Sequence, residues 1–467
     1  MAVEKSSARL PFWEKVGYGF GDLASVLYWQ TISAYLLYFY TDVFGISAAA
    51  AGTMILVTRL WDGINDPLMG VIADRTKTRW GKFRPYLLWM SVPLAVMGVL
   101  TFSVPDLGPS GKLIYAYVTF TLLMMLYTAI NIPYSSLLGV ITPDSVERTS
   151  VASFKYTFAF ASGIIVSAVA LPLATKLDRT YPGRGWSITM AIFGAFAVLF
   201  FLITFLSTKE RVQPPPKQKT SIKQDLLDLV NNRPWLILLI ATMLIILFVA
   251  TRMSVTTHYF KYYIGTQTLS FFGKSYTFEF DVLTSAFITV GQAFALLGVI
   301  VTAPMARLFG KKRAFLMLFV VAALTTAAFY FFKPEHLFLI FLFQILNTFS
   351  SGPLTPLLWA MYADTADYSE WKNGRRATGL IFSASTMSQK FGWAIGTAFA
   401  GWLMAIFGFK ANIIQSDQVQ QGIVLLMSVI PAALGALSIV VMYFYQLDDK
   451  TMKKIQAELE AKRQIEQ

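Results

Sequence analysis

The sequence predicts an all-α polytopic membrane protein with twelve transmembrane helices in two six-helix halves. The chain has 467 residues, of which 55% are hydrophobic, and its mean hydropathy is +0.56. These values exclude an ordinary soluble domain. Apolar stretches of about 20 residues or more, long enough to cross a bilayer, recur about twelve times along the chain. The predicted spans are 16–44, 48–74, 84–104, 112–141, 150–175, 187–207, 234–264, 281–306, 313–332, 337–363, 377–407 and 422–446.

Six spans lie on each side of a polar central segment that runs from Lys209 to Pro234. Three consecutive prolines at 214–216 and five basic residues before Asp225 predict a linker that leads into a short amphipathic helix. We therefore expect four parts. They are an N-terminal six-helix bundle over 1–207, a cytoplasmic linker over 208–233, a C-terminal six-helix bundle over 234–449 and a cytoplasmic tail over 450–467.

The two halves repeat polar motifs at equivalent places. The basic segment 70–82 follows the second span, and the basic segment 303–312 follows the eighth. In the same way, 143–149 follows the fourth span and 364–378 follows the tenth. Two parallel six-helix halves with a binding site between them at mid-membrane are typical of major facilitator transporters.

The basic residues cluster in the segments between alternate spans and give the chain a net charge of +13. The positive-inside rule assigns these segments, and with them both termini, to the cytoplasm. Topology thus explains the charge without a nucleic-acid partner, and we expect a multi-pass protein of a bacterial-type inner membrane. Cysteine is absent, which excludes disulfide frameworks and thiolate metal sites.

Arg59, Asp62 and Asp66 place one cation and two carboxylates inside the second predicted span. An ionisable side chain near the bilayer centre costs a few kcal/mol, so such residues usually face a partner or a water-filled path. Their spacing of i, i+3 and i+7 puts the three side chains on one helix face, with Asn65 beside them. The alternative interpretation is a structural ion pair with a capping asparagine.

Six motifs extend this pattern along the chain: Tyr18–Asp22, Tyr40–Asp42, Trp61–Gly70, Arg79–Pro85, Tyr127–Tyr134 and Asp364–Trp371. Together they resemble the glycoside-pentoside-hexuronide cation symporters, the family of melibiose permease. The resemblance covers about residues 12–450. It implies a major facilitator fold and a secondary symporter, not an enzyme, that imports a glycoside or related sugar with Na⁺ or H⁺ by alternating access.

The resemblance implies that Asp62 and Asp66 bind the coupling cation and that Asn65 and Thr128 supply further oxygens. Sodium needs a cage of oxygens, whereas a proton needs only one carboxylate, so these four residues favour a sodium site. No other cofactor is expected. Two neighbouring carboxylates also need a counter-charge, which Arg59 or Lys390 can supply. For Lys390, an isolated charge in the eleventh span, the alternative is that its side chain reaches the membrane interface.

Asp22, Asn131 and Lys155 are expected to bind the sugar, and Lys155 aligns with a family arginine thought to contact substrate. A carboxylate accepts hydroxyl donors, an amide both donates and accepts, and an ammonium donates. Melibiose permease has acids where this chain has Val26 and Asn131, so galactoside specificity is not implied. Aromatic side chains that could stack on a sugar ring, or simply pack, are Tyr28, Trp29, Tyr127, Tyr134 and Trp359.

A further set of charged residues follows the second, fourth and tenth spans. We expect these residues to form ion pairs that break and re-form as the halves rock, without binding sugar. The set comprises Asp74, Arg75, Arg79, Arg148, Asp364, Asp367, Glu370, Arg375 and Arg376.

Other classes of function stay open at this point. A cation-coupled symporter of lysolipids or other amphiphiles is the nearest alternative, and it would need an apolar cleft for the lipid tail. A membrane enzyme would need a nucleophile or an acid–base pair near an interface. A channel fits parallel repeats with mid-membrane charges less well than alternating access does. We expect a monomer whose partners are the bilayer and a small sugar or glycoside.

Overall fold

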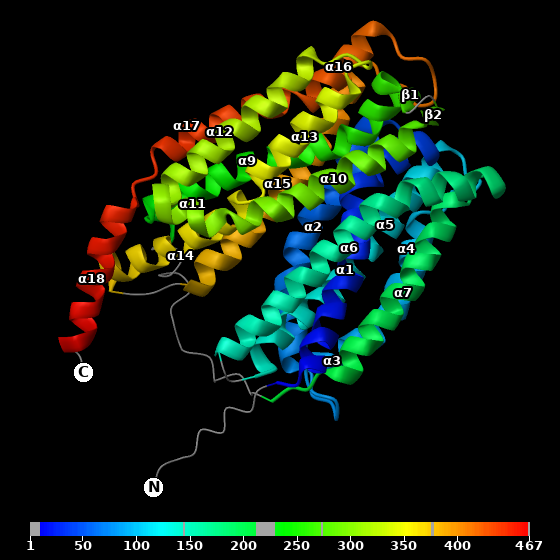
Figure 1. Ribbon diagram of the computed structural model, residues 1–467. Coiled ribbons are helices and arrows are strands. Elements are labelled where there is room, and N and C mark those ends of the chain that lie inside the picture. The colour runs from blue at the N-terminus through cyan, green and yellow to red at the C-terminus, as the bar shows by residue number, and fades with distance from the viewer. Residues whose placement is uncertain (1–9, 143–144, 212–228, 272–273, 375–377, 466–467) are drawn as a thin grey trace. The chain divides into compact units, whose positions relative to one another are not determined.

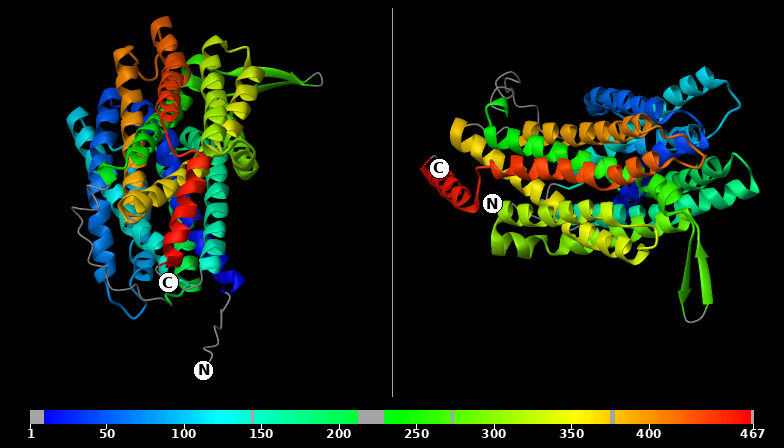
Figure 2. Two further views of the ribbon diagram at one scale, coloured as in Figure 1. Left: turned by 90° about the vertical axis from the view of Figure 1, so that its left-hand side faces the viewer. Right: turned by 90° about the horizontal axis from the view of Figure 1, so that it is seen from above.

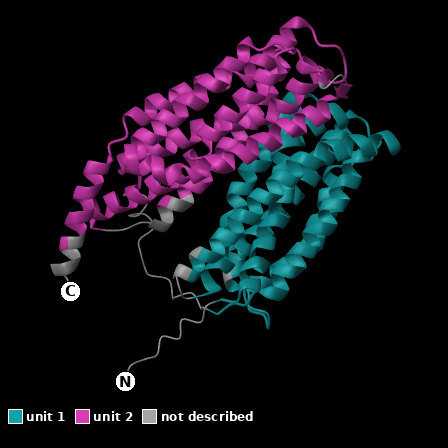
Figure 3. Cartoon of the chain, viewed as in Figure 1, with its two compact units in different colours: residues 1–217 teal, residues 218–467 magenta. Residues whose placement is uncertain are grey.

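The structure is a computed structural model that describes residues 10–142, 145–211, 229–271, 274–374 and 378–465 (Figure 1). The chain divides into two compact units, unit 1 over residues 1–217 and unit 2 over residues 218–467 (Figure 3). Each unit is described by itself below.

Unit 1 is a bundle of long helices in which α1 packs against both α6 and α7, α2 packs against α5, and α4 packs against α7 (Figure 1). Its helices are α1 (Phe12–Tyr38), continued by the π-helical turn η1 (Phe39–Val43), α2 (Ala48–Arg75), α3 (Arg84–Trp89), α4 (Ser91–Thr101), α5 (Pro109–Val140), α6 (Ser145–Thr180) and α7 (Gly185–Ser207). The local sequence explains several helix starts. Ser47 caps α2 by accepting a hydrogen bond from the Ala50 amide at 3.3 Å, and proline occupies the first turns of α3 and α5.

Unit 2 is built around α9, which packs against α15 and α17, while α10 packs against α13 and α12 against α13 and α17. Its first elements are α9 (Arg233–Tyr259), η2 (Phe260–Ile264), β1 (Gln267–Phe271), β2 (Lys274–Phe278), α10 (Phe280–Ile300), α11 (Thr302–Phe309), α12 (Lys311–Ala327) and η3 (Ala328–Phe331). The remaining elements are α13 (Leu337–Ser351), α14 (Leu354–Asn373), α15 (Thr378–Ile406), α16 (Asp417–Met427), α17 (Val429–Tyr443) and α18 (Asp449–Ile465).

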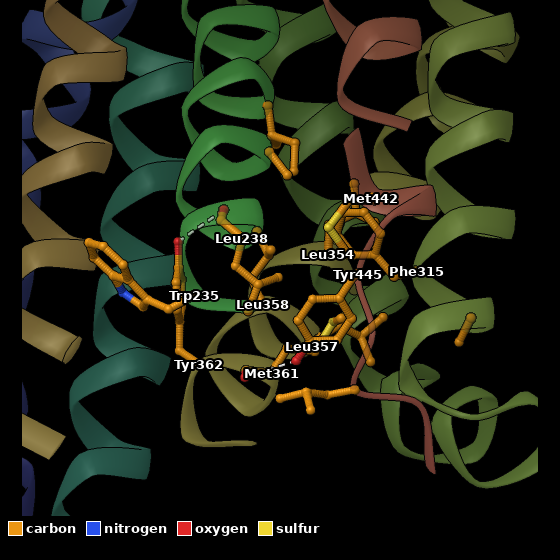
Figure 4. Packing of buried hydrophobic residues seen from close by; sticks show 14 of the residues in the cluster. Trp235, Leu238, Phe315, Leu354, Leu357, Leu358, Met361, Tyr362, Met442 and Tyr445 are labelled. Atoms are coloured by element: carbon orange, nitrogen blue, oxygen red, sulfur yellow. Dashed lines mark hydrogen bonds between the residues drawn. The ribbon is translucent and has the colours of Figure 1, made fainter. Parts of the chain in front are cut away.

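The core of unit 2 joins α9, α12 and α14 through buried aliphatic and aromatic side chains (Figure 4). Tyr362 lies fully buried in this core and shares a hydrogen bond of 2.7 Å with the hydroxyl of Thr242. Trp235 donates from Nε1 to Ser385 Oγ at 3.2 Å. The polar groups of these side chains find hydrogen-bond partners within an apolar core. Directional hydrogen bonds and apolar burial therefore both hold α14 and α15 against α9.

The predicted fold class is confirmed, because helices occupy all twelve predicted hydrophobic segments. In the described part of the chain, eight segments are long and apolar enough to cross a membrane by length and composition alone. They are Pro109–Val140, Ser150–Thr180, Gly185–Ser207, Arg233–Ile264, Phe280–Ile300, Lys311–Phe331, Leu337–Asn373 and Asp417–Tyr443. The other four predicted spans contain α1, α2, α15 and the pair α3–α4. Three of these carry charged residues, among them Asp22, Asp62 and Lys390, and the fourth is divided at Met90.

Two segments form elements that the sequence analysis did not predict. The link after α9 forms an antiparallel hairpin of β1 and β2 that projects from the helices of unit 2 (Figure 2), with Thr268 opposite Thr277 and Ser270 opposite Ser275. The segment expected to be a tail forms α18, which packs on α14 and buries Met452, Ile455 and Leu459. The amphipathic helix expected in the central linker falls on residues 212–228, outside the described residues.

Gly21 on α1 provides the space in which α5 approaches. A Cβ atom at this position would overlap the ring of Tyr134 on α5, which is itself fully buried. A buried ring cannot swing aside without disturbing the neighbouring helices. The absence of a side chain at residue 21 is therefore a condition for the packing of α1 on α5.

Gly21→Ala should lower the free energy of unfolding by about 1–3 kcal/mol, the usual cost of forcing extra volume into a packed core. The matched control is Gly139→Ala on α5, where a Cβ would meet nothing within 4 Å. Thermal unfolding of the purified protein in detergent measures both. Equal melting temperatures for the two variants would show that Tyr134 does not limit the approach of α1.

Candidate functional site

Asp62 and Asp66 on α2 are brought together by Thr128 on α5. The hydroxyl of Thr128 donates to Asp62 Oδ1 at 2.6 Å and lies 3.0 Å from Asp66 Oδ1. Asp62 and Thr128 are buried, with 3% and 2% of their surfaces exposed. Two carboxylates and one hydroxyl therefore form an oxygen cluster between α2 and α5, which we call the acidic cluster. Asn65, half-buried on α2, precedes Asp66.

Arg59 supplies positive charge beside the acidic cluster. Its buried guanidinium interacts electrostatically with both Asp62 and Asp66. It also lies over the ring of Trp29 on α1, with Cζ 4.5 Å from the ring centroid. One basic side chain thus faces two acidic ones, so the acidic cluster has more acidic than basic groups.

Trp29 connects the acidic cluster to α1. Its ring stacks on Tyr127 with centroids 6.3 Å apart and planes inclined by 26°. Tyr127 immediately precedes Thr128 in the chain, and Trp29 also lies under Arg59. Aromatic stacking and the cation–π contact thus hold α1, α2 and α5 together at one level.

A second polar cluster in unit 1 contains Asp22 and Lys155. Lys155 Nζ lies 3.9 Å from Asp22 Oδ1, with 19% and 14% of the two side chains exposed. Lys155 Nζ also lies 5.5 Å from the ring centroid of Tyr134. Tyr134 stacks on Tyr18 at 4.7 Å, and each tyrosine hydroxyl donates to the backbone carbonyl of the other residue. We call these four residues the Asp22–Lys155 cluster.

The remaining predicted sugar-binding residues lie in different surroundings. Asn131 donates from Nδ2 to the Tyr127 carbonyl at 3.2 Å, which ties it to its own helix. Tyr28 is fully buried on α1 and close to Gly98 and Gly194, a placement that favours packing over ring stacking. Trp359, on α14 of unit 2, lies 5.9 Å from Tyr362 and packs against the core of that unit.

Lys390, the second residue predicted to balance charge, lies half-buried on α15 of unit 2. Among the described residues of unit 1, Arg59 is the basic partner that the structure gives to the acidic cluster. The role of Lys390 stays a prediction.

The charged residues expected to control access are placed as follows in unit 1. Arg148 donates from Nη2 to the Thr142 carbonyl at 3.0 Å. Arg79 lies over the ring of its neighbour Trp80 at 4.6 Å. Arg75 ends α2, and the side chain of Asp74 is outside the described residues.

In unit 2, Asp364 pairs with Lys311, which begins α12. Lys311 is not among the charged residues that the sequence predicted to form these ion pairs, and the pair joins α14 to a different helix. Asp367 and Glu370 are half-buried on α14, while Arg375 and Arg376 lie outside the described residues.

Sequence reasoning missed two acids that organise the end of unit 1 where α3 begins. Glu210 accepts hydrogen bonds from the amides of three consecutive residues, Lys82, Phe83 and Arg84, at 2.9, 2.8 and 3.0 Å. Glu14 forms a bidentate pair with Arg211 at 2.6 and 2.8 Å, and this carboxylate raises the pKa of the Arg211 guanidinium. Neither acid belongs to a motif that the sequence analysis used. The partners of Glu210 are backbone amides, which leave no signal in the sequence.

Arg252 is the third residue that sequence reasoning missed. It lies in α9 within the seventh predicted span and is buried, with 8% of its surface exposed. A charged residue inside an apolar span was the available signal, the same signal that had singled out Lys390.

Helices that match the predicted spans, with buried acidic and basic groups inside them, fit a polytopic membrane transporter. A family model described as MFS/sugar transport protein matches residues 17–449. The chain belongs to this family of membrane transporters, and the resemblance to glycoside-pentoside-hexuronide cation symporters is confirmed.

Two similar proteins support this assignment, and one solved structure shares the fold. The chain is 36% identical over 452 residues to YagG of Escherichia coli K12, provisionally named a glycoside/cation symporter, covering 97% of this chain and 95% of that one. It is 36% identical over 457 residues to the isoprimeverose transporter of Lactiplantibacillus pentosus, covering 97% and 92%. The solved structure of the nucleoside transporter NupG matches with a TM-score of 0.61 at 15% identity, covering 93% of this chain and 100% of that one, and shows the fold alone.

Glu210→Ala should lower the free energy of unfolding by about 1–3 kcal/mol, because the amides that precede and begin α3 lose their shared acceptor. Hydrogen exchange at Lys82, Phe83 and Arg84 should accelerate together, as measured by mass spectrometry on the purified protein. Glu210→Gln is the matched control, since its amide oxygen still accepts. Unchanged exchange in the alanine variant would mean that water replaces the carboxylate without cost.

Proposed function

We propose that this protein is a symporter that imports a glycoside or related sugar together with sodium by alternating access. The observation that carries the proposal is the acidic cluster, in which Thr128 bridges Asp62 and Asp66 inside a membrane bundle. The family assignment supports sugar transport in general, and the relatives include an isoprimeverose transporter and a protein provisionally named a glycoside/cation symporter.

The composition of the acidic cluster favours sodium over a proton. A hard cation that has lost its water prefers several oxygen ligands, of which carboxylates and hydroxyls are suitable. Asp62, Asp66 and Thr128 provide three side chains of this kind, and the amide of Asn65 lies next to Asp66 in the sequence. A proton would need one carboxylate only, so the hydroxyl bridge would be superfluous.

The sugar is assigned to the Asp22–Lys155 cluster and to the half-buried rings of Trp29 and Tyr127. The carboxylate accepts and the ammonium donates, which suits the paired hydroxyls of a polyol. Both side chains keep part of their surface exposed, at 14% and 19%, so a solute can reach them. Asn131 is assigned to the same function, with its carbonyl oxygen as the acceptor.

Trp29 offers a physical route by which sugar and cation sense each other. It stacks on Tyr127 and supports Arg59, whose charge offsets the acidic cluster. A cation that enters the cluster changes the field at Arg59, and a sugar that contacts α1 shifts Trp29. Binding of one ligand would then alter the affinity for the other by the same factor in both directions.

Coupling to one sodium ion can supply the energy for accumulation. A membrane potential of about 100 mV is worth about 2.3 kcal/mol per charge, or roughly 50-fold accumulation. We place the protein in a bacterial-type inner membrane as a monomer, with both termini and the charged residues of the cytoplasmic links inside. Asp364, Asp367, Glu370 and the basic residues of those links are assigned to control of access.

Sodium should tighten sugar binding to the purified protein, and sugar should tighten sodium binding by the same factor. Calorimetric titration with a panel of glycosides, with and without sodium, measures this coupling. Thr128→Val removes the bridging hydroxyl and should weaken sodium binding about tenfold, the value of one hydrogen bond to a charged group. Thr128→Ser keeps the hydroxyl and is the matched control.

A sugar affinity that follows pH and ignores sodium would contradict the sodium assignment. Equal sodium affinity in Thr128→Val and Thr128→Ser would remove the hydroxyl from the site while leaving the two carboxylates in place.

Asp62→Asn and Asp66→Asn should each abolish sodium-driven accumulation of sugar in membrane vesicles, because the cluster then holds too little negative charge for a cation. Sugar binding and exchange should persist, and the protein should fold, since a neutral side chain costs less in the membrane than a charged one. Asp106→Asn, at an exposed acid between α4 and α5, is the control. Full accumulation by either variant would leave that aspartate as part of a structural ion pair with Arg59.

A further inference from the structure

Arg252 on α9 is a buried cation that no carboxylate offsets within the described part of the chain. Its interactions are with the side chains of Asn347 and Gln344 and with nearby aromatic rings. This differs from Arg59 in unit 1, which lies beside two aspartates. A buried charge without a counter-ion is costly, and proteins usually avoid it.

Two neutral amide oxygens hold the guanidinium in place. Nη1 donates to Asn347 Oδ1 at 3.1 Å and Nη2 donates to Gln344 Oε1 at 2.8 Å, both on α13. Cζ also lies 4.7 Å from the ring centroid of Phe329. The guanidinium is thus fixed in direction, but its positive charge is not neutralised.

The orientation of the Asn347 amide is itself fixed by α12. Its Nδ2 donates to the Ala322 carbonyl at 2.8 Å and to Thr326 Oγ1 at 2.8 Å. With both protons of the amide directed at α12, only the oxygen can face Arg252. Hydrogen bonds that join α9, α13 and α12 therefore fix the orientation of the Arg252 guanidinium. Side-chain packing alone would not require such a network.

Donors remain on the guanidinium for a ligand. Arginine has five N–H groups, and the two hydrogen bonds to Asn347 and Gln344 use two of them. The Nε atom is buried and has no hydrogen-bond partner. Unused N–H donors on a fixed guanidinium favour an oxyanion, since a carboxylate accepts two parallel bonds from such a group.

A cavity of about 200 Å³ lies against Arg252. It is smaller than the roughly 300–1,000 Å³ that drug-sized ligands occupy, so it suits a small solute or one end of a larger one. Polar side chains on its wall besides those of the arginine network are Thr256, Gln292, Thr348 and Ser351. Phe248, Met253, Phe287 and Ile288 supply an apolar wall.

We propose that this cavity binds the carboxylate of a small hydroxylated acid, with Arg252 as the group that recognises the charge. The hydroxyl and amide groups on the wall accept and donate hydrogen bonds as a polyol requires, while the guanidinium provides the anion-specific contact. The cavity lies within unit 2, whereas the acidic cluster and the Asp22–Lys155 cluster lie within unit 1. The proposal therefore adds a second recognition site and does not depend on the identity of the coupling cation.

Binding of D-glucuronate and D-glucose to the purified full-length protein tests the proposal. The two sugars share a ring and differ at C6, where one has a carboxylate and the other a hydroxymethyl group. Calorimetric titration at constant ionic strength should show tighter binding of D-glucuronate. Arg252→Gln should remove that preference, with a loss of about tenfold or more in D-glucuronate affinity and little change for D-glucose.

Arg233→Gln is the matched control, because Arg233 lies exposed on the same helix and away from the cavity. Arg252→Lys, which keeps the charge but loses the planar fork, should bind D-glucuronate with intermediate affinity. Equal affinity of the unmodified protein for the two sugars would overturn the proposal. So would a folded Arg252→Gln protein that still prefers D-glucuronate as strongly as the Arg233→Gln control does.

A second variant serves if Arg252→Gln does not fold. Gly291 on α10 lines the cavity, and a Cβ atom there would overlap Gln344 Nε2. Gly291→Ala should therefore displace the amide that holds Arg252 and narrow the cavity while the charge is kept. Melting temperature checks its fold. Retention of the D-glucuronate preference by this variant would identify Arg252 as a structural brace between α9 and α13.

An anionic lipid headgroup offers a similar oxyanion, and competition separates the two sources. Phosphatidylglycerol added to the protein in a neutral detergent should leave D-glucuronate binding unchanged if the cavity takes a soluble acid. Displacement of D-glucuronate by phosphatidylglycerol, lost in Arg252→Gln, would assign the cavity to lipid and overturn the proposal. Sodium coupling at Thr128 is measured separately, so failure at one site leaves the other test intact.

Discussion

The structure depends on how charge is kept inside helices that are otherwise apolar. The contact between α2 and α5 shows the solution, since the Thr128 hydroxyl bridges Asp62 and Asp66 and the Thr58 and Thr121 hydroxyls pair at 3.2 Å. An unsatisfied polar group in this position would cost several kcal/mol, so each of these groups needs the facing helix. These contacts therefore favour one register of α2 against α5. That register sets the positions of the oxygen atoms in the acidic cluster.

The two units satisfy the same requirement with different chemistry. In unit 1, opposite charges lie close together, as Arg59 does to Asp62 and Asp66 and Lys155 does to Asp22. In unit 2, Asp364 likewise pairs with Lys311, whereas neutral amides and an aromatic ring hold Arg252. An ion pair neutralises the charge of both its members, whereas the neutral amides hold the Arg252 guanidinium without neutralising its charge.

The sequence predicted the helices, and it singled out two aspartates that the structure brings together, for identifiable reasons. Membrane-spanning segments are long and apolar, and Asp62 and Asp66 stand out against such a background at helical spacing. The family resemblance singled out Thr128, and the structure adds that its hydroxyl lies between the two aspartates. Glu210 escaped because its partners are backbone amides, and Asp364 pairs with Lys311 across 53 positions of the chain, which no local pattern reveals. The strands β1 and β2 are each five residues long and alternate polar with apolar side chains, so a search for long apolar segments does not detect the hairpin.

The packing of α18 affects the order in which the protein is assembled. Met452, Ile455 and Leu459 belong to the same buried cluster as residues of α9, α12 and α14, and Trp371 donates to Glu458 at 2.5 Å. The core of unit 2 therefore stays open during synthesis until nearly the whole chain has left the ribosome. Unit 1 meets no such delay, because all its helices precede residue 208. During translation, the apolar surface of unit 2 that α18 covers thus stays exposed until a late stage, so an interrupted chain presents apolar side chains that the folded protein buries.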